Sequence, residues 1–105
     1  MSKVDVGDPA AEREEFESLN RFQRAMWDKL KVNRHKGGWK GADPDLLARR
    51  VQNELLELNE ALESVAASKD LPWFSEEIDK AQRECADIAN FAMMVFDALE
   101  EMRKR

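Results

Sequence analysis

Two pairs of acidic residues with helical spacing are the part of this chain best suited to chemistry. Glu54 and Glu57 form one pair, and Glu84 and Asp87 form the other, each with a separation of three residues. That separation places both side chains of a pair on one face of an α-helix. Two such faces brought together offer only carboxylate oxygens, which are the ligands that Mg²⁺ prefers in proteins. The sequence therefore predicts a Mg²⁺ site, and with it chemistry on phosphate groups.

The two pairs differ in their surroundings. From Cys85 to Val95 the sequence is apolar almost throughout, apart from Asp87 and Asn90. An ionised carboxylate in such surroundings is unfavourable unless it is paired, neutralised or bound to a metal, which favours a functional role for Asp87. The first pair belongs to a longer run of glutamates that a solvated, exposed helix face explains equally well, and this alternative stays open.

The composition indicates one small all-α domain. The chain has 105 residues, 43% of them apolar and 37% charged, with only four Gly and three Pro. These proportions suit amphipathic helices and leave little room for a β fold with many turns. The formal charge of −5 argues against binding to a nucleic acid polymer, which requires a basic face. A single nucleotide is compatible with this charge, because a bound metal supplies the local positive charge.

Cysteine content and hydropathy predict the compartment. Cys85 is the only cysteine, which is compatible with a reducing environment. The first residues lack the apolar run of a signal peptide, and no segment combines membrane-spanning length with an absence of charge. We therefore expect a cytoplasmic protein that has no membrane partner.

Local signals predict three helices. An aspartate followed by proline, at Asp8-Pro9 and again at Asp43-Pro44, is typical of a helix N-cap with proline in the first turn. These signals predict a loose tail over 1–7, a first helix over 9–32 and a second helix that ends near 66–70. Ser75 is the expected N-cap of a third helix that continues to the basic end of the chain. Residues 8–105 are thus expected to form one domain.

Apolar side chains at spacings of three and four should form the core. In the first helix these are Phe16, Leu19, Phe22, Met26 and Leu30, and in the second they are Leu47, Val51, Leu55, Leu58, Leu62 and Val65. Three helices of this kind enclose a thin core, and the third carries further apolar residues outside its own stripe. We therefore expect a helical bundle that is completed by homo-oligomerisation.

The acidic motifs also resemble those of a known family. Glu54-Leu-Leu-Glu57 followed by Glu84-Cys-Ala-Asp87 resembles the E-x-x-E … E-x-x-D signature of the MazG-like, all-α nucleoside triphosphate pyrophosphohydrolases. The resemblance extends through Lys36-Gly-Gly-Trp39, the helix over 46–62 and the segment over 87–95. It covers roughly two thirds of the chain, in the order that the family has.

The resemblance implies an activity and roles for the four acids. Such proteins hydrolyse a (d)NTP between the α and β phosphates to a (d)NMP and pyrophosphate, in nucleotide-pool house-cleaning, and they assemble as homodimers or homotetramers. Glu54, Glu57, Glu84 and Asp87 would be the ligands of Mg²⁺, for which Mn²⁺ is an alternative. One of the four, with Glu57 as the best candidate, would instead orient or deprotonate the attacking water. Asn53 stands where many members carry another acid, so the number of metals stays open.

Four further residues are predicted to bind the substrate. Lys36 and Lys40 could contact phosphates, and Trp39 could stack on a base or pack against the first helix. Asn90 could bind sugar or phosphate, or order Asp87. Two rival functions use the same residues: a non-catalytic helical interaction module, and a nucleotide-binding sensor that holds the triphosphate without cleaving it. The preferred base and sugar are not determined.

Overall fold

A computed structural model describes residues 8–34 and 37–104, and every regular element in that part is a helix. The helices are α1 (Pro9–Val32), α2 (Pro44–Ala67) and α3 (Phe74–Arg103). The prediction of three main helices without strands is confirmed for these residues, whereas the predicted tail over 1–7 lies outside them. No helix in the described part combines the length and the apolar character that crossing a membrane requires.

The first two helices begin where the sequence predicts. Asp8 Oδ1 accepts hydrogen bonds from the backbone N–H groups of Ala10 at 3.1 Å and Ala11 at 3.2 Å. Asp43 Oδ1 accepts one from the N–H of Asp45 at 2.9 Å. Each aspartate therefore satisfies N–H groups that have no partner within the helix, and proline occupies a position where no N–H is needed.

The predicted start of the third helix is wrong by two residues. Ser75 lies inside α3, and the N-cap is Trp73, whose side chain makes no capping hydrogen bond. The reason lies in the connection, where the N–H of Leu71 bonds to Ser68 O at 2.8 Å and the N–H of Phe74 bonds to Leu71 O at 3.1 Å. These consecutive tight turns bring the backbone into helical geometry before Ser75 is reached.

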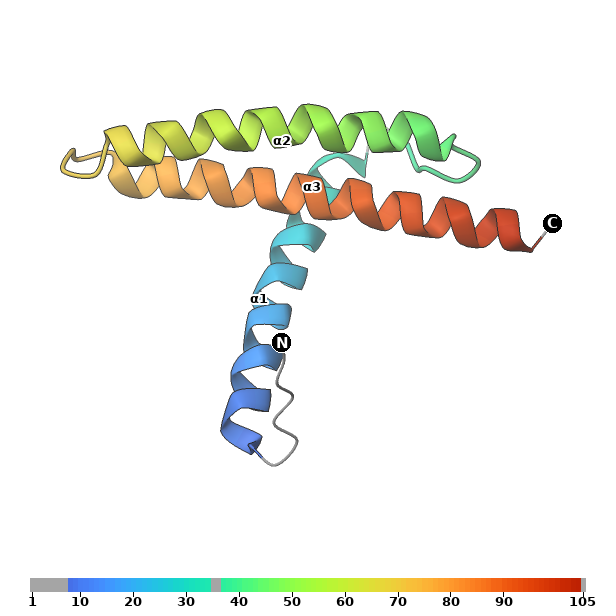
Figure 1. Ribbon diagram of the computed structural model, residues 1–105, viewed down its shortest axis with the longest axis horizontal. Coiled ribbons are helices and arrows are strands. Elements are labelled where there is room, and N and C mark those ends of the chain that lie inside the picture. Colours follow the sequence, from blue (N-terminus) through green and yellow to red (C-terminus); the bar gives the residue numbers. More distant parts are fainter. Residues whose placement is uncertain (1–7, 35–36, 105) are drawn as a thin grey trace.

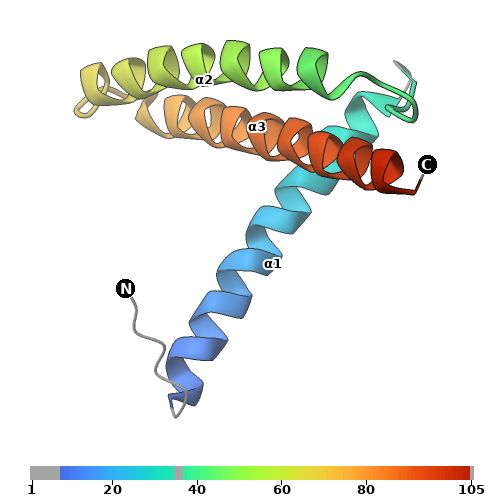
Figure 2. The ribbon, with the colours of Figure 1, turned by 45° about the vertical axis from the view of Figure 1, so that its right-hand side comes forward.

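The arrangement is a helical hairpin with a projecting arm. α2 and α3 lie side by side and antiparallel, whereas α1 crosses α3 with its C-terminal half and extends away from the hairpin (Figures 1 and 2). The radius of gyration is 16.8 Å, compared with about 13 Å for a compact domain of this length. A single chain therefore does not close the expected bundle.

The face that α2 turns toward α3 differs from the predicted stripe. After the first residue of α2, the side chains that are not exposed are Leu47, Val51, Glu54, Leu58, Ala61 and Val65, followed by Ser68 at the C-cap. They alternate spacings of four and three, which is the repeat of two helices packed along one seam. Leu55 and Leu62, predicted for the core, are 49% and 51% exposed. As a result, Glu54 occupies a seam position between Val51 and Leu58.

The predicted stripe of α1 is also only partly buried. Phe16 and Leu19 are 63% and 62% exposed, and every residue from Glu12 to Arg24 is exposed. Met26 and Leu30 are half-buried, because only the C-terminal half of α1 reaches α3. Within one chain the prediction is therefore wrong for the first half of this helix.

Candidate functional site

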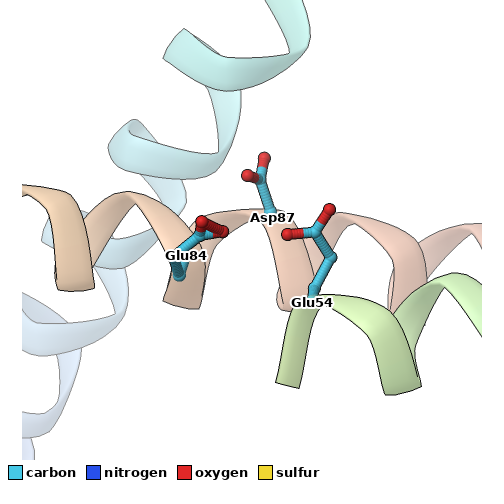
Figure 3. A group of neighbouring side chains, drawn as sticks. All are labelled: Glu54, Glu84 and Asp87. Atoms are coloured by element: carbon cyan, nitrogen blue, oxygen red, sulfur yellow. The ribbon is translucent and has the colours of Figure 1, made fainter. Parts of the chain in front are cut away.

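Three of the four predicted metal ligands converge on the seam between α2 and α3. Glu54 comes from α2, and Glu84 and Asp87 come from α3 (Figure 3). One oxygen of each lies within 4.8 Å of the others. The spacing of three residues puts Glu84 and Asp87 on one face of α3, and the seam position of Glu54 brings it opposite them. We call Glu54, Glu84 and Asp87 the carboxylate cluster.

Glu57 stands at the edge of the carboxylate cluster. It lies about one turn beyond Glu54 on α2 and is exposed. Besides burial, the interaction with Glu57 raises the pKa of Glu54, so Glu57 acts on the carboxylate cluster electrostatically. Its oxygens are nevertheless not among the three that lie within 4.8 Å of one another. Its position therefore differs from that of the other three acids.

Part of the carboxylate cluster is buried without hydrogen-bond partners among the described residues. Glu54 Oε2 and Glu84 Oε1 are buried and have no hydrogen-bond donor among the described residues. Burial, the interactions with Glu57 and Glu84, and the charge of Asp87 raise the pKa of Glu54 from 4.5 to about 8. Burial also raises the pKa of Glu84. Glu54 therefore retains a proton near neutral pH, and a hard divalent cation could replace that proton and satisfy the buried oxygens. The donor set fits Mg²⁺.

A lysine from α1 completes the immediate surroundings. Lys29 Nζ lies 3.4 Å from Asp87 Oδ2, and the two side chains are 25% and 18% exposed. Its charge also lowers the pKa of Glu84, against the larger effect of burial. The sequence analysis did not identify Lys29. In the sequence, Lys29 is notable only because it lies beside the stripe residues Met26 and Leu30. This position does not reveal which carboxylate the lysine pairs with.

Two cavities adjoin the carboxylate cluster. The larger has a volume of about 650 Å³, within the range of small-molecule sites, and the smaller about 390 Å³. The larger is lined by aromatic and cationic side chains together with a buried amide: Trp27, Trp39, Phe91, Arg34, Arg50 and Asn90. The smaller is lined mainly by charged side chains, including Glu57, Glu84, Lys80 and Arg83. Lys29 and Asp87 line both cavities.

Trp39, one of the residues predicted to bind substrate, lines the larger cavity. Its indole Nε1 donates a hydrogen bond to Asp97 Oδ2 at 3.2 Å, which ties the ring to α3. The indole N–H is thereby occupied, and stacking is the interaction left to the ring. Asp97 itself was not identified from the sequence.

Asn90 is 5% exposed and joins two helices. Its Nδ2 donates a hydrogen bond to Met26 O of α1 at 3.0 Å, while its buried Oδ1 has no partner among the described residues. Lys40 is exposed and lines neither cavity. Lys36 lies outside the described residues. Asn90 thus combines a structural contact with a free acceptor beside the larger cavity.

No family model matches the chain, and no curated protein or solved structure matches it either. The proposed relation to the MazG-like proteins therefore depends on the motif residues, and the site is interpreted from its own geometry.

Without a divalent cation, the protein is expected to become less stable as the pH rises from 4.5 to about 8. Glu54 has a higher pKa in the folded protein than when unfolded, so folding binds a proton in this range and is favoured at the acidic end. Glu57, Glu84 and Asp87 oppose its ionisation, and Lys29 is the nearby cation. We expect a loss of about 1–2 kcal/mol after allowance for solvent screening.

Urea unfolding in EDTA across this range measures the effect, with Glu54→Gln as the control that removes the titrating group. The difference in the free energy of unfolding between the two proteins, taken at each pH, separates the effect of Glu54 from that of the other acids. If the free energy of unfolding changed with pH equally in wild type and Glu54→Gln, Glu54 would ionise normally in the folded chain.

Proposed function

We propose that the protein is a Mg²⁺-dependent nucleoside triphosphate pyrophosphohydrolase acting on the cytoplasmic nucleotide pool. It cleaves a (d)NTP between the α and β phosphates and releases a (d)NMP and pyrophosphate. The observation that carries this proposal is the convergence of Glu54, Glu84 and Asp87 within 4.8 Å, next to a cavity of about 650 Å³. Oxygen ligands, aromatic surfaces and cations are the groups that a metal-bound nucleotide requires.

The carboxylate cluster would hold Mg²⁺, or Mn²⁺ as a substitute. The bound metal neutralises the triphosphate and lowers the pKa of a water molecule. Glu54 and Glu84 contribute oxygens that are otherwise buried without donors, and Asp87 contributes an oxygen at the junction of both cavities. The three acids would thus hold the metal beside Asp87, which borders both cavities.

We assign the role of general base to Glu57. It is exposed, lies about one turn from Glu54 on α2 and lines the smaller cavity, so its carboxylate is beside the metal site without being part of the three-oxygen cluster. In the proposed reaction, Glu57 accepts a proton from water as the water oxygen bonds to the α-phosphorus. The bond from that phosphorus to the bridging oxygen breaks, and this oxygen leaves with pyrophosphate.

The larger cavity suits the nucleoside part of the substrate. Trp39 offers a ring for stacking, and Arg50 offers a cation on the adjacent part of α2. The guanidinium of Arg34 lies 5.4 Å from the centre of the Trp27 ring, a cation–π contact at the same cavity. Aromatic faces of this kind tolerate different bases, so they support the nucleotide class and leave the base open.

The first test is product analysis. Purified protein is incubated with each common NTP and dNTP, Mg²⁺ and water labelled with ¹⁸O, and the products are separated by chromatography. We expect pyrophosphate and a monophosphate that carries the label, because water attacks the α-phosphorus. Diphosphate with labelled orthophosphate would contradict the proposed position of attack. Binding of a triphosphate without turnover would favour the sensor alternative.

Self-association is the second part of the proposal. Large apolar side chains remain exposed on all three helices: Phe16, Leu19 and Phe22 on α1, Leu55, Leu56 and Leu62 on α2, and Phe96, Leu99 and Met102 on α3. Monomeric proteins rarely leave extended apolar surface uncovered. A homodimer or homotetramer that packs the projecting arm against another copy would bury this surface and complete a bundle. The same surface also suits the rival interaction module, whose partner would be a different protein.

Joint replacement of Phe16→Glu and Leu19→Glu is expected to shift the protein to monomer, because two charges enter the apolar stripe of the arm. Size-exclusion chromatography with light scattering gives the mass. The control is Ser18→Glu with Arg21→Gln, which makes the same change in net charge mainly away from this stripe. Equal masses for wild type and the double glutamate variant would place the interface elsewhere, or show that the chain is monomeric.

A further inference from the structure

Lys29 stands where the two cavities meet. It lines both, as does Asp87, the carboxylate that it contacts at 3.4 Å. Arg34 and Arg50 line only the larger cavity, and Lys80 and Arg83 line only the smaller one. Among the described cations, Lys29 is therefore the one placed at the boundary between an aromatic compartment and a charged compartment.

We propose that Lys29 leaves Asp87 when a divalent cation occupies the carboxylate cluster, and then binds the polyphosphate of the substrate. This inference rests on the proposed function and adds a phosphate-binding residue to it. In the metal-free protein, the ammonium group of Lys29 compensates the charge of the Asp87 carboxylate. Once the metal takes the Asp87 oxygen, Lys29 remains at the boundary and contacts phosphate oxygens on either side of the bond that is cleaved.

The contact between Lys29 and Asp87 is suited to exchange. Its separation of 3.4 Å is longer than the roughly 2.7–2.9 Å of a strong charge-assisted hydrogen bond. Lys29 is still 25% exposed, so its flexible side chain can move without first being released from a packed core. Asp87 also has Glu54 and Glu84 within 4.8 Å, so a cation at this place faces acidic oxygens from three side chains, whereas Lys29 is paired with Asp87. A divalent cation is therefore the stronger partner for this set.

An independent feature indicates that the larger cavity receives a ligand. Asn90 is 5% exposed, lines this cavity and has a buried Oδ1 without a partner among the described residues. A buried acceptor left without a donor is unfavourable, and a hydroxyl or amino group of a nucleoside would satisfy it. With the nucleoside in this cavity, the phosphates run past Lys29 toward the smaller cavity and its cations Lys80 and Arg83.

The test compares Lys29→Met with Lys31→Met. Lys31 lies two residues away on α1 and pairs with Asp28 at 3.4 Å, so its replacement removes the same charge from the same helix outside the site. Mn²⁺ affinity is measured by electron paramagnetic resonance, and binding of inorganic tripolyphosphate with Mg²⁺ is measured by calorimetry. Neither readout requires turnover or a known base. Circular dichroism verifies folding, and Lys29→Gln provides the same test if Lys29→Met does not fold.

We expect Lys29→Met to bind Mn²⁺ at least as tightly as wild type, because the competing ammonium is gone. Its tripolyphosphate affinity should fall by about tenfold or more, the effect of losing a charge-assisted contact. Lys29→Arg should retain most of that affinity, and Lys31→Met should match wild type in both measurements.

Unchanged tripolyphosphate binding in Lys29→Met would overturn the proposal. A parallel loss of Mn²⁺ affinity and thermal stability would also overturn it, because Lys29 would then be a structural link between α1 and α3. Failure of wild type to hydrolyse any (d)NTP would count against the proposed function, and the two binding measurements would still decide the role of Lys29.

Discussion

Asp87→Asn is expected to reduce hydrolysis by about a thousandfold or more while the protein stays folded. Asp87 is the member of the carboxylate cluster that borders both cavities. Asparagine keeps its shape but removes the negative charge and one strong oxygen ligand for Mg²⁺. Because the ion pair with Lys29 is partly exposed, its loss should change the free energy of unfolding by only about 1 kcal/mol. Initial rates of pyrophosphate release measure the first effect, and urea unfolding measures the second.

Glu60→Gln is the matched control for this variant. Glu60 lines the smaller cavity and is exposed, but it does not belong to the carboxylate cluster. Its replacement removes one negative charge from the same region and should leave the rate within about threefold of wild type. Full activity in Asp87→Asn would refute the assigned metal site. An equal loss in both variants would instead point to a general effect of charge.

Glu54→Gln is expected to remove the stabilisation by Mg²⁺ and to stabilise the metal-free protein above neutral pH. Glutamine resembles the protonated acid that Glu54 already is near neutral pH, since its pKa is raised to about 8. Above that pH it avoids an unfavourable buried charge, and the gain should be about 1–2 kcal/mol. It also removes a carboxylate ligand, so the rise in melting temperature caused by Mg²⁺ in wild type should disappear.

Thermal melts with EDTA and with Mg²⁺, near pH 7 and near pH 9, separate these effects. Glu63→Gln on the same helix is the control, because Glu63 is exposed and lines neither cavity. A Mg²⁺ response that persists in Glu54→Gln would exclude Glu54 as a ligand. A loss of stability in its metal-free form would indicate that the Glu54 carboxylate has a structural role.

The seam position of Glu54 helps to decide whether this residue is a metal ligand or part of a solvated helix face. A seam position ordinarily holds an apolar residue, as at Val51 and Leu58 on either side. Leu55, the next residue, is 49% exposed although it would pack well there. An acid that breaks the local pattern without a compensating donor is expected mainly at functional sites. This supports the metal site over the solvated stripe that the sequence also allowed.

The sequence by itself determined the number of helices, the starts of two of them and much of the acidic site. Capping by Asp8 and Asp43 acts within a few residues, so the starts of α1 and α2 could be predicted from neighbouring residues alone. The pairing of Glu84 with Asp87 depends only on the helical repeat, and its apolar surroundings are visible in the sequence.

Tertiary structure decided what the sequence could not. The seam of α2 could include either Glu54 or Leu55, because both continue a spacing of three or four, and only packing against α3 selected Glu54. Trp39 meets Asp97 across 58 residues, and Asn90 meets Met26 across 64. Lys29 reaches Asp87 in the same way. Such contacts depend on where α1 and the connection that follows it lie against α3, a relation between surfaces that local periodicity does not encode.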